Sequence, residues 1–158
     1  MAALRKRTTD SPPKKNNDNL PGQPKIIVDK SELNLQTFEE NYLKVLSGNA
    51  DSFAKLFADA VDYQYYDKGL APRAYILDSH QKFCARWPSR QYLLDGDITI
   101  KIDEDMVEME VPYEYIYRDE KNKISKGFST DSLILNLHGD SWLVSSYRQK
   151  VRRKRNDK

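Results

Sequence analysis

The sequence predicts an α+β fold in which three helices near the N-terminus cover one face of an antiparallel sheet. Two observations lead to this prediction. In the first half of the chain, apolar residues recur at the three- and four-residue steps of amphipathic helices, and in the second half they alternate with polar residues as in strands. Helices that precede a run of strands joined by short turns are typical of layered α+β domains. The 158 residues are enough for one such domain.

Three helices are expected before the main run of strands. The first spans 33–46 and carries a single apolar stripe. The second is short, spans 50–57, and has Asn49 as its N-cap. The third spans 72–87, because a proline suits the first helical turn and Pro88 cannot continue the helix.

One strand is expected between the second and third helices, at 61–66, where aromatic and β-branched residues dominate. The rest of the chain alternates between apolar and polar residues and predicts an antiparallel sheet. Its segments are expected at 90–102, with a bend, bulge or hairpin turn at 95–97, and at 106–117, 125–137 and 142–147. Pro112 lacks the N–H that a ladder needs, so it predicts an edge or a bulge. The predicted order is therefore α-α-β-α-β-β-β-β.

Charge divides the chain into three parts. Residues 1–31 carry seven Lys or Arg against three acids, and we expect a disordered, proline-containing basic arm there. Residues 32–148 form the expected domain, which is acidic. Residues 149–158 form an expected basic tail, with candidate phosphate-binding residues at Arg152, Arg153, Lys154 and Arg155. Such a cluster predicts contact with nucleic acid or an anionic surface through the tails, although a solvated tail has the same composition.

Several classes of protein do not fit the composition. No apolar run approaches the roughly 18 residues of a membrane-spanning helix. The basic N-terminus is not followed by the apolar segment of a secretory signal, so a cytoplasmic protein is expected. One cysteine and two histidines leave no set of ligands typical of a transition-metal centre, and neither a metal nor a cofactor is expected.

Two motifs and the order of elements resemble the nuclear transport factor 2-like superfamily. The first expected strand ends in Tyr65-Tyr66-Asp67-Lys68-Gly69, and the third expected helix ends in Arg86-Trp87-Pro88-Ser89-Arg90. The pattern Arg-Trp-Pro-x-Arg is similar to a bacterial subset of the superfamily. The resemblance covers about residues 33–148 and implies a strongly curved sheet that wraps round the helices as a cone with an open pocket. Ketosteroid isomerases, dehydratases, polyketide-cyclase-like enzymes and assembly domains share this fold, so the fold does not decide the function.

His80 lies on the apolar face of the third expected helix and is a candidate general acid or base, since its pKa is ordinarily near neutrality. The alternative is a hydrogen-bonded core histidine. If the protein is an enzyme, the candidate catalytic residues are His80, Asp62, Tyr63 and Asp131. The candidates for lining a ligand pocket are Tyr63, Tyr65, His80, Phe83, Trp87, Arg86 and Arg90.

Two further patterns have a functional and a structural interpretation. Eight of the ten tyrosines lie on expected strands, where they would suit a ligand pocket, a partner interface or simply a half-exposed sheet face. Arg86 and Arg90 flank Trp87-Pro88 and could clamp an anionic ligand at the mouth of the cone. Alternatively, the guanidinium groups stack on Trp87 or pair with Asp62 or Asp67.

The leading hypothesis is a non-catalytic module with a pocket for a small apolar ligand, or one that forms a homodimer or docks a protein partner through its sheet face. The second hypothesis is a small-molecule isomerase, dehydratase or cyclase that uses acid–base residues in the cone. The third is tail-mediated binding to nucleic acid or an anionic surface.

Overall fold

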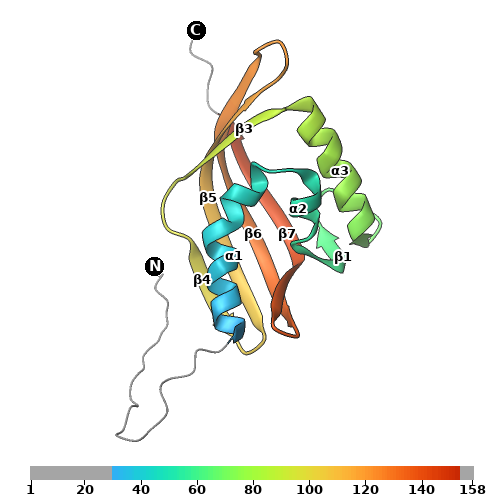
Figure 1. Cartoon of the computed structure of the whole chain (residues 1–158), viewed down its shortest axis with the longest axis vertical. Helices are drawn as coiled ribbons and strands as arrows, with labels where there is room; N and C mark the ends of the chain where they lie inside the picture. Colours follow the sequence, from blue (N-terminus) through green and yellow to red (C-terminus); the bar gives the residue numbers. More distant parts are fainter. Residues whose placement is uncertain (1–29, 154–158) are drawn as a thin grey trace, which may run out of the picture.

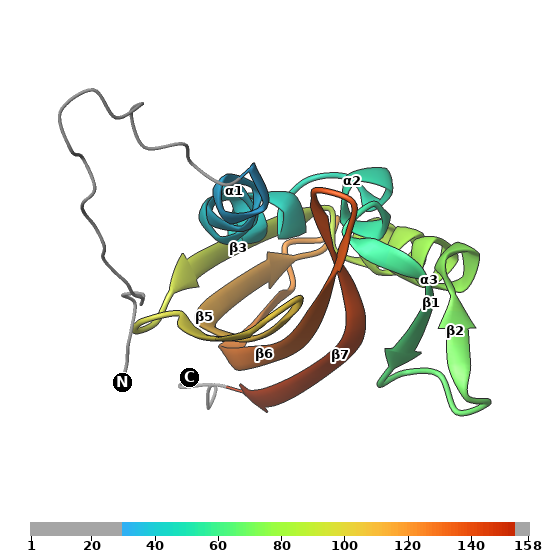
Figure 2. The ribbon, with the colours of Figure 1, turned by 90° about the horizontal axis from the view of Figure 1, so that it is seen from below.

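The computed structural model describes residues 30–153. They form a curved sheet with three helices on its concave side (Figures 1 and 2). The helices are α1 (Lys30–Leu46), α2 (Ala50–Ala54) and α3 (Arg73–Arg86). The strands are β1 (Phe57–Tyr63), β2 (Leu70–Pro72), β3 (Ser89–Leu94), β4 (Thr99–Asp103), β5 (Met106–Arg118), β6 (Ile124–His138) and β7 (Ser141–Arg153). The α+β class is confirmed.

The sheet has the order β2-β1-β7-β6-β5-β3, and β4 pairs with β5 as well. The three long strands β5, β6 and β7 are antiparallel neighbours at its centre, while β1 runs parallel to β7. β3 and β4 pair with successive parts of β5, and Pro112 lies between these parts. Its carbonyl accepts a hydrogen bond from the Asp95 N–H at 2.9 Å. The proline thus lies where β5 changes its neighbour, a position that needs no ladder N–H.

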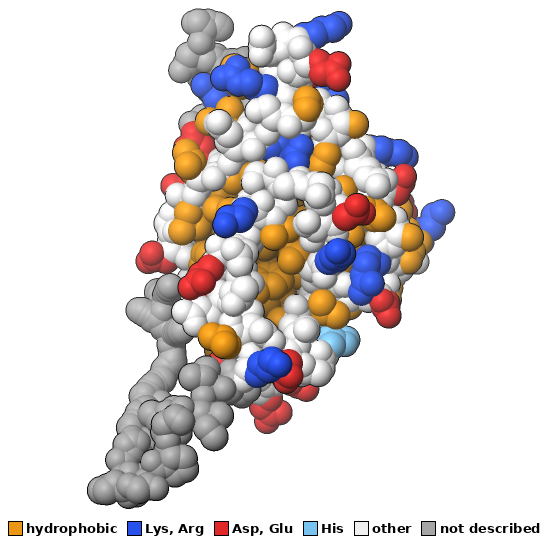
Figure 3. Space-filling model, viewed as in Figure 1, with side chains coloured by type: hydrophobic (Ala, Val, Ile, Leu, Met, Phe, Trp, Pro, Cys, Tyr) orange, Lys and Arg blue, Asp and Glu red, His pale blue; other side chains and the backbone are white. Residues whose placement is uncertain are grey.

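The core lies between the helices and the concave face of the sheet. The alternation predicted for β5 is observed, since Val107, Met109 and Val111 are fully buried. Tyr42 and Leu46 of α1 pack into the same cluster. Each buried side chain of this size contributes about 1.5–3 kcal/mol relative to an exposed one, so the helices are held mainly by this burial. Charged side chains of both signs cover the helical side of the molecule, around a recess with hydrophobic side chains (Figure 3).

Several predicted boundaries were wrong. α2 ends at Ala54 rather than at residue 57, and β1 begins at Phe57 rather than at residue 61. Parallel pairing explains the difference, because Val144 donates its N–H to the Leu56 carbonyl at 2.8 Å and draws this segment into the sheet. The short strand β2 was not predicted, so the observed order differs from the expected one. Tyr65 follows β1 instead of lying within it.

The last strand is longer than predicted. β7 continues to Arg153 instead of ending at 147, because β6 supplies partners as far as Gly127, which pairs with Arg153. Residues 149–153 therefore belong to the sheet rather than to a tail. Lys154 and Arg155 lie outside the described residues, as do residues 1–29 of the expected N-terminal arm. None of the helices in the described part is long and apolar enough to cross a membrane.

Candidate ligand-binding cavity

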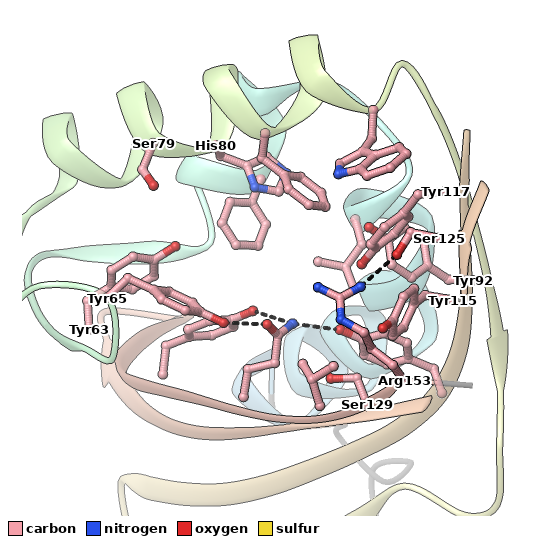
Figure 4. Close-up of a pocket in the computed structure, with 18 residues that line it drawn as sticks. Tyr63, Tyr65, Ser79, His80, Tyr92, Tyr115, Tyr117, Ser125, Ser129 and Arg153 are labelled. Atoms are coloured by element: carbon pink, nitrogen blue, oxygen red, sulfur yellow. Dashed lines mark hydrogen bonds between the residues drawn. The ribbon is translucent and has the colours of Figure 1, made fainter. Parts of the chain in front are cut away.

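A cavity of about 420 Å³ lies between α3 and the concave face of the sheet (Figure 4). Seven of the ten tyrosines line it: Tyr63, Tyr65, Tyr92, Tyr113, Tyr115, Tyr117 and Tyr147. Apolar side chains complete much of the wall, among them Leu46, Phe53 and Phe83 from the helices and Trp87 directly after α3. The cavity therefore presents aromatic surface on most sides, with phenol groups at several points.

The pairing of β5 with β6 explains why the cavity is hollow. Along β6, small residues alternate on the concave face at Ser125, Gly127 and Ser129, directly opposite Tyr117, Tyr115 and Tyr113 of β5. On this face β5 carries large tyrosine side chains, whereas β6 carries side chains of almost no volume. The large and small residues thus leave space above β6 that α3 covers.

A buried carboxyl group lies beneath the cavity floor. Asp131 has no exposed surface, and its Oδ2 accepts a hydrogen bond from the Tyr42 hydroxyl at 2.8 Å. Its Oδ1 accepts from the Tyr113 hydroxyl at 2.9 Å and from Gln149 Nε2 at 3.2 Å, with Ser129 Oγ at 3.5 Å. Burial raises the pKa of Asp131 to about 6, although these hydrogen bonds act in the opposite direction. Its oxygens are occupied by donors from the protein itself.

Gln149 connects this carboxyl group to the cavity wall. Its Nε2 also donates to the hydroxyls of Tyr113 at 3.0 Å and Tyr147 at 3.3 Å. Its Oε1 accepts a hydrogen bond from the Tyr65 hydroxyl (Figure 4). The amide is thus fixed in one orientation, and the floor presents an ordered row of hydroxyl groups.

His80 faces the cavity from α3 (Figure 4). Its ring stacks on Phe53, with the centroids 3.9 Å apart and the planes inclined by 19°. The residue is 8% exposed, and its Nε2 has no hydrogen-bond partner within the described residues 30–153. Burial lowers the pKa of His80 to about 4, and the positive charge of Arg90 acts in the same direction. The imidazole is therefore neutral at pH 7, and its Nε2 lacks a partner among the described residues.

The structure brings five of the predicted pocket residues together at this cavity: Tyr63, Tyr65, His80, Phe83 and Trp87. It does not bring together the predicted acid–base set. Asp131 lies behind Tyr113 and Gln149, and neither it nor Tyr63 hydrogen-bonds to the Nε2 of His80. The imidazole stacks on Phe53, while its Nε2 has no hydrogen-bond partner among residues 30–153.

Two predicted residues are held by ion pairs at exposed positions. Asp62 pairs with Arg148 of β7 at 2.8 Å and takes no part in the cavity lining, because alternation along β1 directs it away from Tyr63. Arg86 lies over the Trp87 ring, 4.2 Å from its centroid, and pairs with Asp119 at 3.3 Å. The stacking interpretation of Arg86 describes this contact, and its acidic partner is neither of the two expected.

Arg90 connects two helix ends. Its guanidinium group donates to the Trp87 carbonyl at 2.8 Å, to the Leu46 carbonyl at 3.4 Å and to the Ser47 carbonyl at 3.3 Å, and also to the Gly48 carbonyl. Leu46 is the last residue of α1, and the other three carbonyls lie just beyond the ends of α1 and α3, where helices leave carbonyl groups without intrahelical partners. Arg90 does not line the cavity, since its donors are used to hold these two ends together.

Sequence reasoning did not place five polar residues at the cavity: Ser79, Ser125, Ser129, Gln149 and Arg153. Of these, Arg153 was expected only as a phosphate-binding candidate of the tail. The basic composition after residue 148 indicated a tail, whereas residues 149–153 are the end of β7. A usable signal was present, because continuing the two-residue period of the last strand beyond Tyr147 places Gln149, Val151 and Arg153 on its inner face. Within residues 30–153, no group of His, Cys, Asp or Glu side chains is arranged to hold a metal ion.

Known structures share this architecture at low sequence identity. The chain matches the Kfla4162 protein from Kribbella flavida with a TM-score of 0.66 and 9% identity, over 78% of this chain and 93% of that one. It matches a candidate dehydratase of the nuclear transport factor 2-like family from Streptomyces avermitilis with a TM-score of 0.62 and 12% identity, over 77% and 97%. A hexachlorocyclohexane dehydrochlorinase, LinA type 2, matches with a TM-score of 0.63 and 10% identity, over 77% and 84%.

The chain has the nuclear transport factor 2-like fold. The curved, unclosed sheet that the resemblance implied is observed, together with a cavity on its concave side. No protein-family model and no curated protein matches the sequence. Since nuclear transport factor 2-like proteins of this low identity share only their fold with the chain, its function has to be argued from the cavity itself.

Proposed function

We propose that the protein is a non-catalytic binding module whose cavity takes a small, flat, largely apolar molecule. The observation that carries the proposal is an open aromatic cavity in which a buried polar atom, His80 Nε2, has no partner within the described residues. A volume of about 420 Å³ lies within the usual range for small-molecule sites, roughly 300–1,000 Å³.

The lining suggests the shape of the ligand. Tyrosine rings offer faces for stacking and edges for T-shaped contact, which favours a planar unsaturated body. Stacked Tyr115 and Tyr117, with centroids 4.5 Å apart, form one such wall. The neutral imidazole of His80 and the hydroxyls of the floor supply hydrogen bonds to one or two polar groups of the ligand.

The same geometry argues against acid–base catalysis as the main role. A general base has to reach a substrate proton with a free lone pair and a pKa near the working pH. Asp131 is covered by donors from Tyr42, Tyr113 and Gln149. The pKa of His80 is about 4, which makes its imidazole a weak base at neutral pH.

One observation favours an enzyme as the second candidate. The pKa of Asp131 is about 6, and Tyr113 connects this carboxyl group to the cavity, so a phenol could pass a proton between them. Two structures with the same fold are named as a candidate dehydratase and a dehydrochlorinase, both elimination chemistries. Turnover of a carbonyl or polyketide-like substrate that is lost in Asp131→Asn and retained in Asp62→Asn would support this candidate over the binding module.

Self-association and tail-mediated binding remain predictions. The outer face of the sheet has a shallow groove of about 470 Å³ with charges of both signs, from Lys101, Glu108, Glu110 and Arg148, and a homodimer could pair such a face with itself. Sedimentation at high protein concentration tests this, and a strict monomer would count against it.

Loss of salt-dependent nucleic-acid binding on removal of residues 149–158 would support the tail hypothesis, but this truncation also shortens β7.

The test of the binding proposal fills the cavity. Ser79→Trp places a large side chain at the cavity lining, whereas Gln81→Trp places the same side chain on the exposed side of α3. We expect the neutral fluorescent probe N-phenyl-1-naphthylamine to bind the wild type and Gln81→Trp with equal affinity. It should bind Ser79→Trp at least about tenfold more weakly, because the new side chain occupies the cavity and the probe loses apolar burial worth roughly 1.4 kcal/mol or more. Equal binding to all three proteins would refute the proposal.

A further inference from the structure

We propose that Arg153, Ser125 and Tyr115 form an anion subsite at one end of the cavity, so that the ligand is a flat aromatic carboxylate. This inference rests on the proposed function, since it names the ligand class of the same cavity. It assigns to Arg153 the anion-binding role that the sequence suggested for Arg86 and Arg90.

Arg153 is a cation available for a ligand. Its Nη1 donates to Ser125 Oγ at 2.8 Å, and Figure 4 shows both side chains at the cavity. Within residues 30–153, no Asp or Glu oxygen lies within 4.0 Å of its guanidinium group, whereas Arg73, Arg86 and Arg148 each have a carboxylate partner. A guanidinium group has five N–H donors in a fixed fork, so the donors without a partner among the described residues are suited to binding a carboxylate.

Tyr115 lies beside Arg153 because the residue between them is a glycine. Tyr115, Gly127 and Arg153 are paired in one row across β5, β6 and β7. A Cβ atom on Gly127 would come within 2.6 Å of the Tyr115 hydroxyl and 2.8 Å of the Arg153 Cα. The missing side chain therefore lets the phenol extend across β6 toward Arg153. Burial raises the pKa of Tyr115, and the positive charge of Arg153 opposes this effect, as expected for close neighbours.

The charge of the cavity favours a single negative charge at this end. Among the lining residues that fall within 30–153, Arg153 is the one Lys, Arg, Asp or Glu side chain. His80, which faces the cavity from α3, is neutral at pH 7. The carboxyl group of Asp131 lies beneath the floor, covered by Tyr113 and Gln149. A carboxylate next to Arg153 would accept hydrogen bonds from the sheet, while the rest of the ligand would contact aromatic side chains. This arrangement suits a flat monoanion.

Two probes of one shape test the inference: 2-naphthoate, which carries the carboxylate, and its neutral amide. Both are measured by displacement of N-phenyl-1-naphthylamine and by calorimetry. We expect the wild type to bind the acid about tenfold or more tightly than the amide, the gain usual for a charge-assisted hydrogen bond. Arg153→Gln should remove this preference and leave binding of the amide unchanged, while Arg153→Lys should retain part of it.

Arg152→Gln is the matched control. It makes the same change of charge one residue earlier, where Arg152 lies over the Phe128 ring on the opposite face of the sheet, 5.0 Å from its centroid. Equal affinity for the acid and the amide, or equal losses in Arg152→Gln and Arg153→Gln, would overturn the subsite while leaving the binding module intact. Failure of the fluorescent probe to bind, or its equal binding to Ser79→Trp, would overturn the proposed function and the subsite together.

Discussion

Two buried ionisable groups lie on opposite sides of the cavity, His80 on α3 and Asp131 beneath the floor, and their effects on stability should oppose each other. Burial lowers the pKa of His80 from 6.5 to about 4, so the unfolded state binds a proton that the folded state does not. This stabilisation is complete above pH 6.5 and is lost as the pH falls toward 4. Burial raises the pKa of Asp131 from 3.8 to about 6, so the folded state binds the extra proton. That stabilisation is complete below pH 3.8 and is lost as the pH rises through 6.

The two effects are similar in size. Each pH unit between the folded and unfolded pKa values of one group corresponds to about 1.36 kcal/mol. His80 therefore contributes roughly 3 kcal/mol to the free energy of unfolding at pH 7 relative to pH 4. Asp131 contributes roughly 3 kcal/mol in the opposite direction over nearly the same interval. The contributions of these two groups should almost cancel in the wild type, and substitution of either one should reveal the other.

His80→Phe removes the titrating group and keeps an aromatic ring against Phe53. Its free energy of unfolding should fall by roughly 3 kcal/mol between pH 4 and pH 7 relative to that of the wild type, because only the Asp131 effect remains. Asp131→Asn should change by a similar amount with the opposite sign. Urea unfolding at pH 4, 5, 6 and 7 measures both slopes, and Asp62→Asn, at an exposed ion pair, is the control. If both variants show the pH dependence of the wild type, neither group titrates as the structure indicates.

Three further predictions concern stability, each measured by urea unfolding at pH 7. Tyr42→Phe removes the α1 hydroxyl that donates to Asp131, and should cost about 1–2 kcal/mol; a loss below roughly 0.3 kcal/mol would contradict the buried hydrogen bond. Gly127→Ala should cost about 1–3 kcal/mol through its contact with backbone at 2.6 Å, whereas Gly48→Ala, with its nearest atom at 3.4 Å, should cost less; equal costs would argue against the close packing. Arg90→Lys should cost about 1–2 kcal/mol, because an ammonium group cannot serve four carbonyls from both helix ends, and an unchanged midpoint would show that these contacts add little.

Local patterns were sufficient to predict the class of the fold. The alternation along β5 fixed which of its residues are buried, and the helical spacing of apolar residues located α1 and α3 within a few positions. Strand ends that depend on a distant partner were not predictable in this way. β1 begins at Phe57 because β7 pairs with it in parallel, and no property of residues 57–60 alone indicates that partner.

The site shows the same division between local and distant information. His80 and the tyrosines were recognisable because their residue types are unusual on an apolar face or on strands. The contacts of Arg86 and Arg90 were recognisable only in part. Stacking of Arg86 on Trp87 was one of the alternatives, but the sequence does not show that Asp119 pairs with Arg86 or that four backbone carbonyls bind Arg90. An arginine next to a pocket is available to a ligand only when the fold leaves its donors unused.

The register of β7 decides which arginine meets that condition. Consecutive residues of a strand point to opposite faces, so Arg152 and Arg153 have the same charge and different surroundings. Arg152 lies over Phe128 on the outer face, whereas Arg153 is opposite Gly127 and reaches the cavity. A shift of one residue in the pairing of β6 with β7 would exchange the two and remove Gln149 from the floor. The polar chemistry of the cavity therefore depends on how far the sheet extends into a segment whose composition resembles that of a tail.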